Sequence, residues 1–510
     1  MPVPQKGGTA LSLVSGRDSN AISTDRPRLT RFRGSNSSYP AASAASSHSR
    51  RLRRPSAMVD DPTALRGRVV ARTTHPAAAA QLGGRVAYGM SDGHGTVCDM
   101  RSRATEAAVT SDDGQHEAGT SIELFTGGGG LAKAMELAGF RHLLCSELAH
   151  HACETLRQNA AVDYKDGAEL PQRLGDPWPL IEGDVGEVQF SGFQGLVDVV
   201  AGGPPCQPFS LGGVHQGHED KRNMFPQVFR VVRETRPRAI VCENVRGLLR
   251  PSFRPYFDYI LRELGAPFER RDSSENWQEH DLRLQKLEAK GAGDPTERYD
   301  VYAIPVNAAD YGVPQVRHRV FIVAFRSDLD IAWETPKPTH SEAALRRAMA
   351  SGDYWEEHGV KRQSSLAKES DSAVDDGLMR WRTLRDAIRG LPAPLDGRQS
   401  PGFLHHVGWP GARIYAGHTP NRLDWPAKTV KAGVHGVPGG ESVLLEDDGS
   451  HRYMTVREAA RVMTFPDDWW LAGPRGEQMR QLGNAVPVAL GQVFARAVAD
   501  ALSAVRPART

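Results

Sequence analysis

The chain has 510 residues, of which 39% are hydrophobic and 24% are charged, and its formal net charge is +2. These values are typical of a globular protein with two or three domains, and the small net charge gives by itself no sign of a nucleic-acid binder, although a local basic face stays possible. There is no run of 18 apolar residues and no apolar core of a signal peptide near the N-terminus, so we expect neither a membrane span nor a signal peptide.

The five cysteines are Cys98, Cys145, Cys153, Cys206 and Cys242. Their positions show neither the spacing of metal ligands nor a dense pairing pattern. This usage is typical of a reducing compartment, so we expect a cytoplasmic protein without a structural zinc site.

Residues 1–118 differ in character from the rest of the chain. Residues 1–57 carry ten Lys or Arg against two acidic residues and sustain no apolar period, which predicts a disordered extension. A basic arm that touches DNA and an organelle transit peptide fit the same bias. An overlong gene start is a third interpretation, because Met90 and Met100 both lie just ahead of the first regular pattern.

The regular pattern begins with a strand over 121–125, a run of four glycines and a helix over 131–138. Strand, glycine loop and helix form the opening of a nucleotide-binding βαβ unit. A second strand, 142–146, ends at Glu147, which lies 20 residues after Gly127. That distance is close to the spacing at which an acid meets ribose hydroxyls, although an ordinary solvated strand end would look the same.

Cys206 lies in the stretch Gly-Gly-Pro-Pro-Cys-Gln-Pro-Phe-Ser, directly after an apolar strand over 196–201. The glycines and prolines prevent a regular helix or a continuing strand, so we expect the thiol on a stiff loop. A thiol there is a candidate nucleophile, the alternative being a buried structural cysteine. The polar, glycine-rich residues 211–223 are typical of a mobile active-site loop, in which His215 and His218 indicate solvated side chains more than a metal site.

Asp184 and Glu243 also stand at the ends of apolar strands. The carboxyl ends of the strands of an open α/β sheet face one crevice, which is where such folds bind their ligands. We therefore expect these two acids to meet Glu147 and Cys206 at one edge of the sheet.

Three polar residues alternate between two further strands, which we expect over 299–305 and 320–325. Gln315, Arg317 and Arg319 share one face if the segment is extended. Alternating arginines are usually a solvated strand edge, but these lead into a strongly apolar strand. An ion-pairing or anion-binding role is therefore the favoured hypothesis.

The remaining sequence indicates where the domains divide. Residues 265–298 are charged and predict an insertion with one short helix. Residues 327–454 change from helical, charged pieces to Pro-, Gly- and Trp-rich sequence, as in a small domain of short strands and loops. Helices then follow over 455–463 and 488–502. We expect an α/β fold with an extension at 1–118, a catalytic domain at 119–329, a smaller mixed domain at 330–454 and a C-terminal segment at 455–505 that returns to the catalytic domain.

A series of short motifs runs along residues 121–502: Phe125-Thr-Gly127-Gly-Gly129-Gly130, Glu147, Asp184, Pro-Pro-Cys206-Gln-Pro-Phe-Ser, Glu243-Asn244-Val245, Gln315-x-Arg317-x-Arg319, the stretch 457–469 (REAARVMTFPDDW) and Gly483-Asn484-x-Val486-Pro487. The glycine loop is unspecific, but the Pro-Cys-Gln, Glu-Asn-Val and Gln-x-Arg-x-Arg elements together are highly specific. In this order they resemble the DNA (cytosine-5)-methyltransferases of bacterial restriction–modification systems. One departure is Glu123, where that family more often has aspartate, and residues 1–118 are not covered.

The resemblance implies a Rossmann-like sheet that binds the methyl donor S-adenosyl-L-methionine (AdoMet), with the target-recognition domain at 330–454. It implies no metal. The catalytic residues that it implies are Cys206, Glu243, Arg317 and Arg319. The AdoMet-binding residues that it implies are Phe125, Gly127, Gly129, Glu147, Leu148, Asp184, Val185, Asn484 and Val486.

The chemistry of cytosine is consistent with these residue types. C5 of cytosine is a poor nucleophile, and a thiolate that adds at C6 makes it nucleophilic. A carboxyl group near N3, for which Glu243 is the candidate, would stabilise the developing charge, and Arg319 and Arg317 would hold the base O2 and a phosphate. A base within a duplex must be flipped out to be reached. The base that later removes the C5 proton is not assigned, and water is possible.

The resemblance also implies partners: double-stranded DNA, and a restriction endonuclease that acts on the same site. We expect a monomer in the bacterial cytoplasm. Thr429-Val430 is similar to a short element of recognition domains, and an ordinary strand residue explains Thr429 equally well. The alternatives are an RNA cytosine-5 methyltransferase, a silent DNA-binding regulator that should have lost Cys206 or Glu243, and a nicotinamide-dependent oxidoreductase that would leave the Cys206 loop unexplained.

Overall fold

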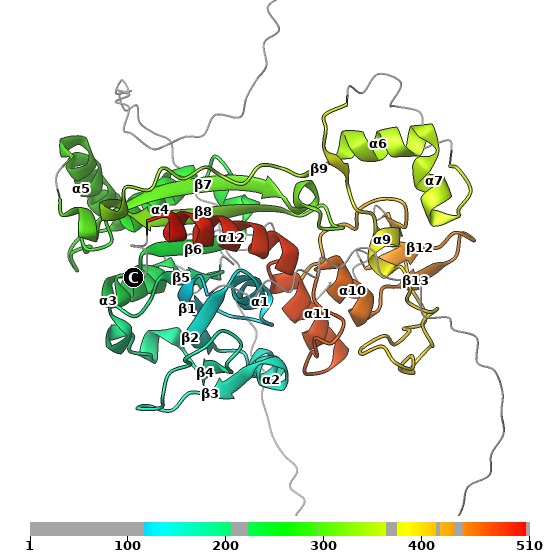
Figure 1. Ribbon diagram of the computed structural model, residues 1–510, viewed down its shortest axis with the longest axis horizontal. Helices are drawn as coiled ribbons and strands as arrows, with labels where there is room; N and C mark the ends of the chain where they lie inside the picture. Colours follow the sequence, from blue (N-terminus) through cyan, green and yellow to red (C-terminus); the bar gives the residue numbers. More distant parts are fainter. Residues whose placement is uncertain are drawn as a thin grey trace, which may run out of the picture. The chain divides into compact units, whose positions relative to one another are not determined.

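The computed structural model describes residues 117–205, 223–291, 293–363, 375–414, 419–432 and 442–505 (Figure 1). All of these residues belong to one compact unit. The predicted extension at 1–118 therefore lies outside the described residues except for its last two positions. Cys206, His215 and His218 lie outside them as well.

An eight-stranded sheet organises the described chain, in the order β3-β4-β2-β1-β5-β6-β8-β7. Neighbouring strands are parallel except that β8 runs antiparallel to both β6 and β7. The strand order reverses between β1 and β5, and the α/β class predicted from the sequence is confirmed. The strands are β1 (Gly119–Leu124), β2 (Phe140–Glu147), β3 (Ala161–Asp163), β4 (Trp178–Glu182), β5 (Val199–Gly202), β6 (Ala239–Val245), β7 (Tyr299–Asn307) and β8 (His318–Arg326).

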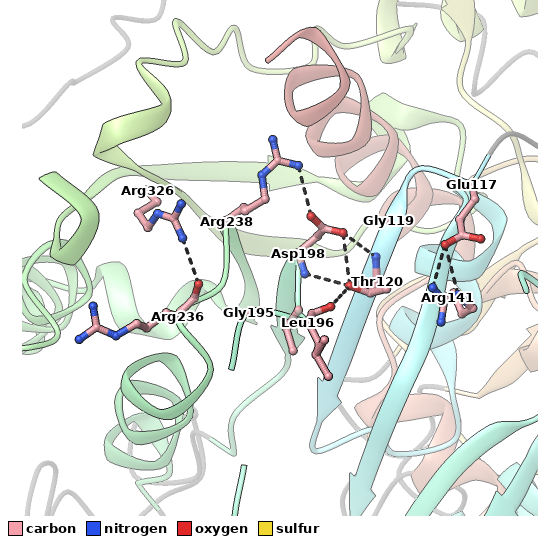
Figure 2. A pocket seen from close by; sticks show the side chains of 11 residues that line it. Glu117, Gly119, Thr120, Arg141, Gly195, Leu196, Asp198, Arg236, Arg238 and Arg326 are labelled. Carbon is pink, nitrogen blue, oxygen red and sulfur yellow. Dashed lines mark hydrogen bonds and ion pairs between the residues drawn. The ribbon is translucent and has the colours of Figure 1, made fainter. Parts of the chain in front are cut away.

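A cavity of about 390 Å³ opens at the edge where the parallel strands begin (Figure 2). Four arginines line it, but all of them are paired with acids. Arg238 contacts Asp198 at 3.2 Å and Arg141 contacts Glu117 at 3.0 Å. Arg236 and Arg326 are paired with acids nearby in the same way. The positive charge of this edge is therefore already balanced, and the predicted site residues stand at the opposite edge.

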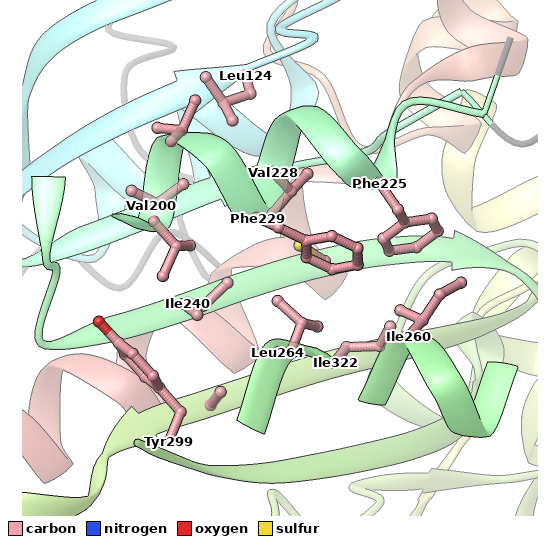
Figure 3. Packing of buried hydrophobic residues seen from close by; sticks show 14 of the residues in the cluster. Leu124, Val200, Phe225, Val228, Phe229, Ile240, Ile260, Leu264, Tyr299 and Ile322 are labelled. Carbon is pink, nitrogen blue, oxygen red and sulfur yellow. The ribbon is translucent and has the colours of Figure 1, made fainter. Parts of the chain in front are cut away.

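Both faces of the sheet are covered by helices because the central strands are apolar on both sides. On one face, α3 (Phe225–Thr235) and α4 (Arg254–Gly265) bury their apolar side chains against β5, β6 and β8 (Figure 3). On the other face lie α1 (Gly130–Leu137) and α12 (Val488–Ala504), where Phe494 stacks on Phe321 with ring centroids 4.0 Å apart. Strand β8 shows the alternation directly. Val320, Ile322 and Ala324 join the first core, whereas Phe321, Val323 and Phe325 join the second.

The region after the sheet has the mixed character that the sequence predicts. It holds two small sheets, β9 (His340–Ser341) with β10 (Met379–Arg380), and β11 (Asn421–Arg422) with β12 (Val443–Leu445) and β13 (His451–Tyr453). Its described α-helices are α6 (Glu342–Ser351), α7 (Asp353–His358) and α9 (Leu384–Ile388).

The C-terminal helices return to the sheet. They are α10 (Val456–Val462), α11 (Arg475–Asn484) and α12, and the predicted helices at 455–463 and 488–502 are confirmed. By length and composition, the helical stretch Arg475–Ala504 is the one candidate membrane span among the described residues. However, 61% of its apolar window is buried inside the protein, which is the pattern of a core helix.

Two strand boundaries differ from those expected. The strand expected to end at Asp184 is β4, which ends at Glu182, because Asp184 instead accepts a hydrogen bond from Gly186 N at 2.8 Å and caps a short 3-10 helix. The strand expected over 196–201 is β5, which begins three residues later. The charged insertion holds α5 (Trp277–Lys290), and α2 (His150–Asn159) lies between β2 and β3. Helices α3 and α4 were not assigned from the sequence.

A buried polar cluster lies within β1 and β2, below the glycine loop. His142 Nε2 donates to the carbonyl of Ala132 at 3.0 Å, and its Nδ1 accepts from Ser121 Oγ at 2.8 Å. Glu123, only 1% exposed, places Oε1 3.7 Å from His142 Nδ1. Burial raises the pKa of the Glu123 carboxyl from its ordinary 4.5 to about 8 and lowers the pKa of His142 to about 4. Both groups are therefore neutral near pH 7.

We expect Glu123→Gln to alter how stability depends on pH. The protonated acid is the form that suits the interior, so its contribution is complete below pH 4.5 and is lost as the pH rises through about 8. The variant lacks this loss, so its free energy of unfolding relative to the wild type should increase by on the order of 1–4 kcal/mol between pH 5 and pH 8. Urea unfolding at both pH values measures the difference. Equal pH slopes for the two proteins would contradict a buried neutral Glu123.

Candidate active site at the carboxyl edge of the sheet

The predicted site residues in the described chain come from the ends of neighbouring strands. Glu147 ends β2, Asp184 follows β4, and Glu243 lies near the end of β6. Arg319 stands at the start of the antiparallel strand β8, opposite Val245 in the register. The sheet therefore brings these residues to one edge, as the sequence predicts.

The loop after β1 holds a conformation that side chains rarely adopt. Phe125 has φ 56° and Gly127 has φ 57°. The amide of Thr126 donates to the carbonyl of Ser146 at 3.1 Å, which ties the loop to β2. Glu147 completes the attachment, since its carboxylate accepts from the amides of Gly127 at 2.7 Å and Ala149 at 2.8 Å. The acid thus fixes the glycine loop to the end of β2.

The next glycines are required by the protein's own packing. A Cβ on Gly129 would stand 2.7 Å from the ring of Trp469, and one on Gly130 would stand 2.3 Å from the carbonyl oxygen of Val486. Trp469 Nε1 also donates to the carbonyl of Gly128 at 3.1 Å. The C-terminal segment therefore lies directly on the loop. The sequence analysis assigned Trp469 no role, although it lies in the motif stretch 457–469.

The chemistry of the surrounding groups fits AdoMet. Among the described residues, a Cβ on Gly127 would meet only the carbonyl oxygen of Phe125, at 3.9 Å, so no other described atom occupies that side of the loop. Leu148 is 68% exposed, which leaves a large apolar side chain available to an adenine ring. Glu147 precedes Leu148 at the end of β2, and Asp184 follows the end of the neighbouring strand β4. Val185 and Val486 are buried, whereas Asn484 is exposed at the end of α11.

Glu243 and Arg319 form a buried ion pair, with Arg319 Nε 2.7 Å from Glu243 Oε1. Burial raises the pKa of the Glu243 carboxyl, and the positive charges of Arg319 and Arg317 oppose the shift. Burial likewise lowers the pKa of Arg319, and Glu243 opposes that shift. A carboxyl group that is held and partly desolvated in this way can donate or share a proton with a substrate nitrogen.

The chain that leads to Cys206 is anchored beside this pair. The amide of Asn244 donates to the carbonyl of Pro204 at 3.0 Å. A Cβ on Gly203 would lie 3.8 Å from Glu243 Oε2. Cys206 itself lies outside the described residues, and its thiol is therefore not located. The sequence analysis gave Asn244 no role of its own, although the Glu-Asn-Val motif contained the signal.

Arg317 is 1% exposed and points away from solvent into the junction of three segments. Its Nη1 donates to the carbonyl of Val430 at 3.0 Å, and its Nη2 donates to the carbonyls of Gly483 and Ala485, both at 2.8 Å. Burial lowers its pKa, with the charge of Arg319 acting in the same direction. Arg317 and Arg319 therefore make different contacts, although they alternate along one segment.

Within the described residues, one group of side chains has the arrangement of metal ligands: Glu357, His358 and Asp386. Arg380 already pairs with both acids, at 2.9 Å from Glu357 and 2.7 Å from Asp386. A guanidinium in that place supplies the positive charge that a metal ion would bring.

The fold and this edge define a class: an α/β enzyme whose glycine loop, paired acids and acid–arginine couple share the carboxyl ends of parallel strands. The family of C-5 cytosine-specific DNA methylases matches residues 119–266 and 278–500, more than half of the chain, and the protein belongs to that family. It methylates C5 of cytosine in DNA, with AdoMet as the methyl donor.

Two type II methyltransferases and one solved structure are among the proteins to which the chain is similar. The type II methyltransferase M.Eco47II of Escherichia coli is 30% identical over 394 residues, which cover 75% of this chain and 79% of that protein. M.NgoMIV of Neisseria gonorrhoeae is 30% identical over 389 residues, covering 75% and 98%. The crystal structure of the S. pombe Dnmt2 methyltransferase aligns at 17% identity over 76% of this chain and 99% of that chain, with a TM-score of 0.44.

Two glycine variants should separate cofactor access from packing. Gly127→Ala adds a methyl group into open space at positive φ, so we expect a stability loss of about 1–2 kcal/mol and an AdoMet Kd raised about tenfold or more. Gly130→Ala meets the carbonyl of Val486 and should destabilise the fold by more than that. Thermal unfolding and calorimetric titration with AdoMet measure both. Wild-type AdoMet affinity in folded Gly127→Ala would contradict a cofactor position beside this glycine.

Proposed function

We propose that the protein methylates cytosine within a specific short sequence of double-stranded DNA, through a covalent bond between Cys206 Sγ and C6 of a flipped-out base. The observation that carries the proposal is the buried Glu243–Arg319 pair beside Gly203, three residues before the cysteine. An acid, a cation and a thiol are the three groups that this reaction needs at one ring.

The proposed sequence of steps begins with attack of the Cys206 thiolate on C6. The S–C6 bond forms, and the electron pair of the C5–C6 double bond moves toward C5 while the Glu243 carboxyl shares its proton with N3. AdoMet, when bound, would supply an electrophilic methyl group to C5, and its sulfur would keep the electron pair of the broken S–CH3 bond and leave as a neutral thioether. A base then removes the C5 proton, the C5–C6 double bond re-forms, the S–C6 bond breaks so that the thiolate is released, and N3 returns its proton to Glu243. The chain offers no assigned base for this step.

The two arginines receive different roles in the proposal. Arg319 holds Glu243 in place and offers its remaining donors to the base O2. For Arg317 we propose a positioning role in place of the phosphate contact that the resemblance implied, because its two terminal nitrogens are bound to three carbonyls. The rigidity of Arg317 would then keep Arg319, two residues later, aligned with the pocket.

On the cofactor side, we propose that Glu147 binds the ribose hydroxyls and Asp184 the adenine amino group, between walls formed by Phe125, Leu148 and Val185. Asn484 and Val486 would close the site from the C-terminal segment. The support is the open side of Gly127 and the exposed Leu148. These residues would bind and orient the donor, and Gly129 would serve by admitting Trp469 to the loop.

For the rest of the molecule, we propose that residues 119–329 form the catalytic domain and that residues 330–454 recognise the DNA target. Residues 455–505 would then return to the catalytic domain. A cognate restriction endonuclease, a monomeric state, a cytoplasmic location and chemistry without a metal belong to the same proposal. A silent regulator is less well supported, because the Glu243–Arg319 pair is intact. The RNA alternative has no support in the family or in the relatives' names.

We expect Cys206→Ala to abolish methylation while AdoMet and DNA binding persist. Base-resolution conversion sequencing of plasmid DNA from expressing cells measures the reaction and its sequence context together. The wild type should mark one short motif, and the variant none. Methylation by folded Cys206→Ala would overturn the covalent mechanism, and unmethylated DNA from folded wild type would overturn the proposed substrate.

Glu243→Gln should lower kcat by about 10²–10⁴-fold with little change in AdoMet Kd, because the amide cannot share a proton with N3. The variant's activity should also lose the part of its pH dependence that the carboxyl group causes. Glu169→Gln is the control for the loss of one carboxylate, since Glu169 is exposed in the loop between β3 and β4 and belongs to neither the proposed site nor the proposed recognition region. A kcat for Glu243→Gln within threefold of the control would rule out the proposed acid.

A further inference from the structure

Residues 314–317 form a short parallel pairing with residues from the proposed recognition region. The amide of Ala427 donates to the carbonyl of Pro314 at 2.9 Å, and the amide of Val316 donates to the carbonyl of Ala427 at 2.9 Å. Gln315 and Ala427 form the bridge between the two segments. Thr429 Oγ1 then donates to the carbonyl of Val316 at 2.9 Å. The recognition segment is therefore registered against the segment that enters β8.

The pairing continues through side chains after the backbones separate. Gln315, 0% exposed, accepts the amide of Val430 at 3.1 Å through Oε1. Arg317 Nη1 donates a hydrogen bond to the carbonyl of Val430 at 3.0 Å. Val430 is buried, and its main-chain groups would otherwise be unsatisfied. The side chains of Gln315 and Arg317, from the segment that precedes β8, thus bind the main-chain groups of Val430 in place of a neighbouring strand.

The other groups of Gln315 are also engaged. Its Nε2 donates to Met463 Sδ at 3.0 Å, and its Oε1 receives a second, longer contact of 3.4 Å from Arg317 Nη1. The amide group can therefore rotate neither away from Val430 nor toward solvent without losing a partner. The side chain of Gln315 is therefore held in one orientation, by Met463 at the end of α10 and by Arg317.

Residues 427–432 are also connected, through the end of α11, to the glycine loop after β1. A Cβ on Gly483 would lie 2.4 Å from the amide nitrogen of Ala432, so the recognition segment lies directly on the end of α11. Three residues after Gly483, the carbonyl oxygen of Val486 packs against Gly130. The end of α11 therefore packs against both residues 427–432 and the glycine loop, and this packing opposes any displacement of residues 427–432. Within that segment, the backbone amide of Val430 has Gln315 Oε1 as its hydrogen-bond acceptor.

We propose that Gln315 is a specificity-determining positioning residue: it fixes Thr429-Val430 in register with the catalytic sheet and so sets how strictly the enzyme discriminates its DNA sequence, without contacting DNA. The inference rests on the proposed recognition role of residues 330–454. Discrimination between sites is a difference between two binding free energies, and a shift of about 1 Å in a positioning element changes rates by up to 10²-fold. Loss of the Gln315 acceptor should therefore loosen residues 427–432, and so reduce sequence discrimination, more than it lowers the rate of methyl transfer.

Three variants test the proposal. Gln315→Met has a similar length and removes the acceptor for Val430 N. Gln315→Glu keeps an acceptor oxygen and should rescue the function. Met463→Leu removes only the partner of Gln315 Nε2 and is the matched control. The readout is the ratio of methylation at the cognate site to methylation at sites with one base changed, together with kcat, the KM for DNA and the AdoMet Kd.

For Gln315→Met we expect the ratio to fall at least tenfold, with AdoMet Kd unchanged within about threefold. For Gln315→Glu and Met463→Leu we expect ratios within about threefold of the wild type. An unchanged ratio in Gln315→Met, or equal losses of the ratio and of AdoMet affinity in all three variants, would overturn the inference. If Gln315→Met fails to fold, Gln315→Asn, which withdraws the oxygen by one methylene, takes its place with the same expected fall.

A wild type that methylates cytosine regardless of its neighbouring bases would overturn the proposed sequence recognition itself. That outcome is distinguishable from a failure of the positioning role. In the first case the wild type has no discrimination to lose, whereas in the second the wild type discriminates and Gln315→Met does so equally well.

Discussion

The guanidinium of Arg317 holds together the parts of this enzyme that lie farthest apart in the sequence. A buried charge is costly unless its donors are bound, and here three carbonyls accept hydrogen bonds from the two terminal nitrogens of Arg317. Two of these carbonyls belong to the end of α11, where a helix has unpaired acceptors and the negative end of its dipole. The third belongs to Val430. The stability of the charge and the position of residues 427–432 therefore depend on the same contacts.

Around this junction, the sheet supplies the reacting groups in a fixed arrangement. Parallel strands bring Glu147, Asp184 and Glu243 to one edge, and the antiparallel strand β8 enters the same edge with Arg319. This antiparallel insertion matters for the chemistry, since a parallel strand there would place an amino-terminal arginine at the opposite edge. The arginine-lined cavity of that opposite edge has its charges already balanced and takes no part in the argument.

The glycine loop serves two purposes that the sequence motif does not separate. At Gly127 the chain leaves space for a ligand, whereas at Gly129 and Gly130 it leaves space for Trp469 and Val486 of the same protein. Glu147 ties the loop to the end of β2 through the amide of Gly127. The glycine loop is thus held in place from β2 and from the C-terminal segment, and this explains physically why the chain returns to the sheet after the smaller domain.

Sequence alone determined the α/β class, the strand ends that carry Glu147 and Glu243, the returning C-terminal helices and the family, because strand periodicity, glycine loops and short motifs are local signals. It did not determine that Asp184 caps a 3-10 helix beyond β4, or that Gln315 and Arg317 bind Val430 while Arg319 binds Glu243. Alternation along the chain predicts a shared face, but it does not identify the partners on that face, because they come from distant parts of the chain: Glu243 on one side and Val430 on the other. Only the tertiary structure decided which polar groups must be satisfied at each buried position, because burial and its desolvation cost arise when distant segments meet.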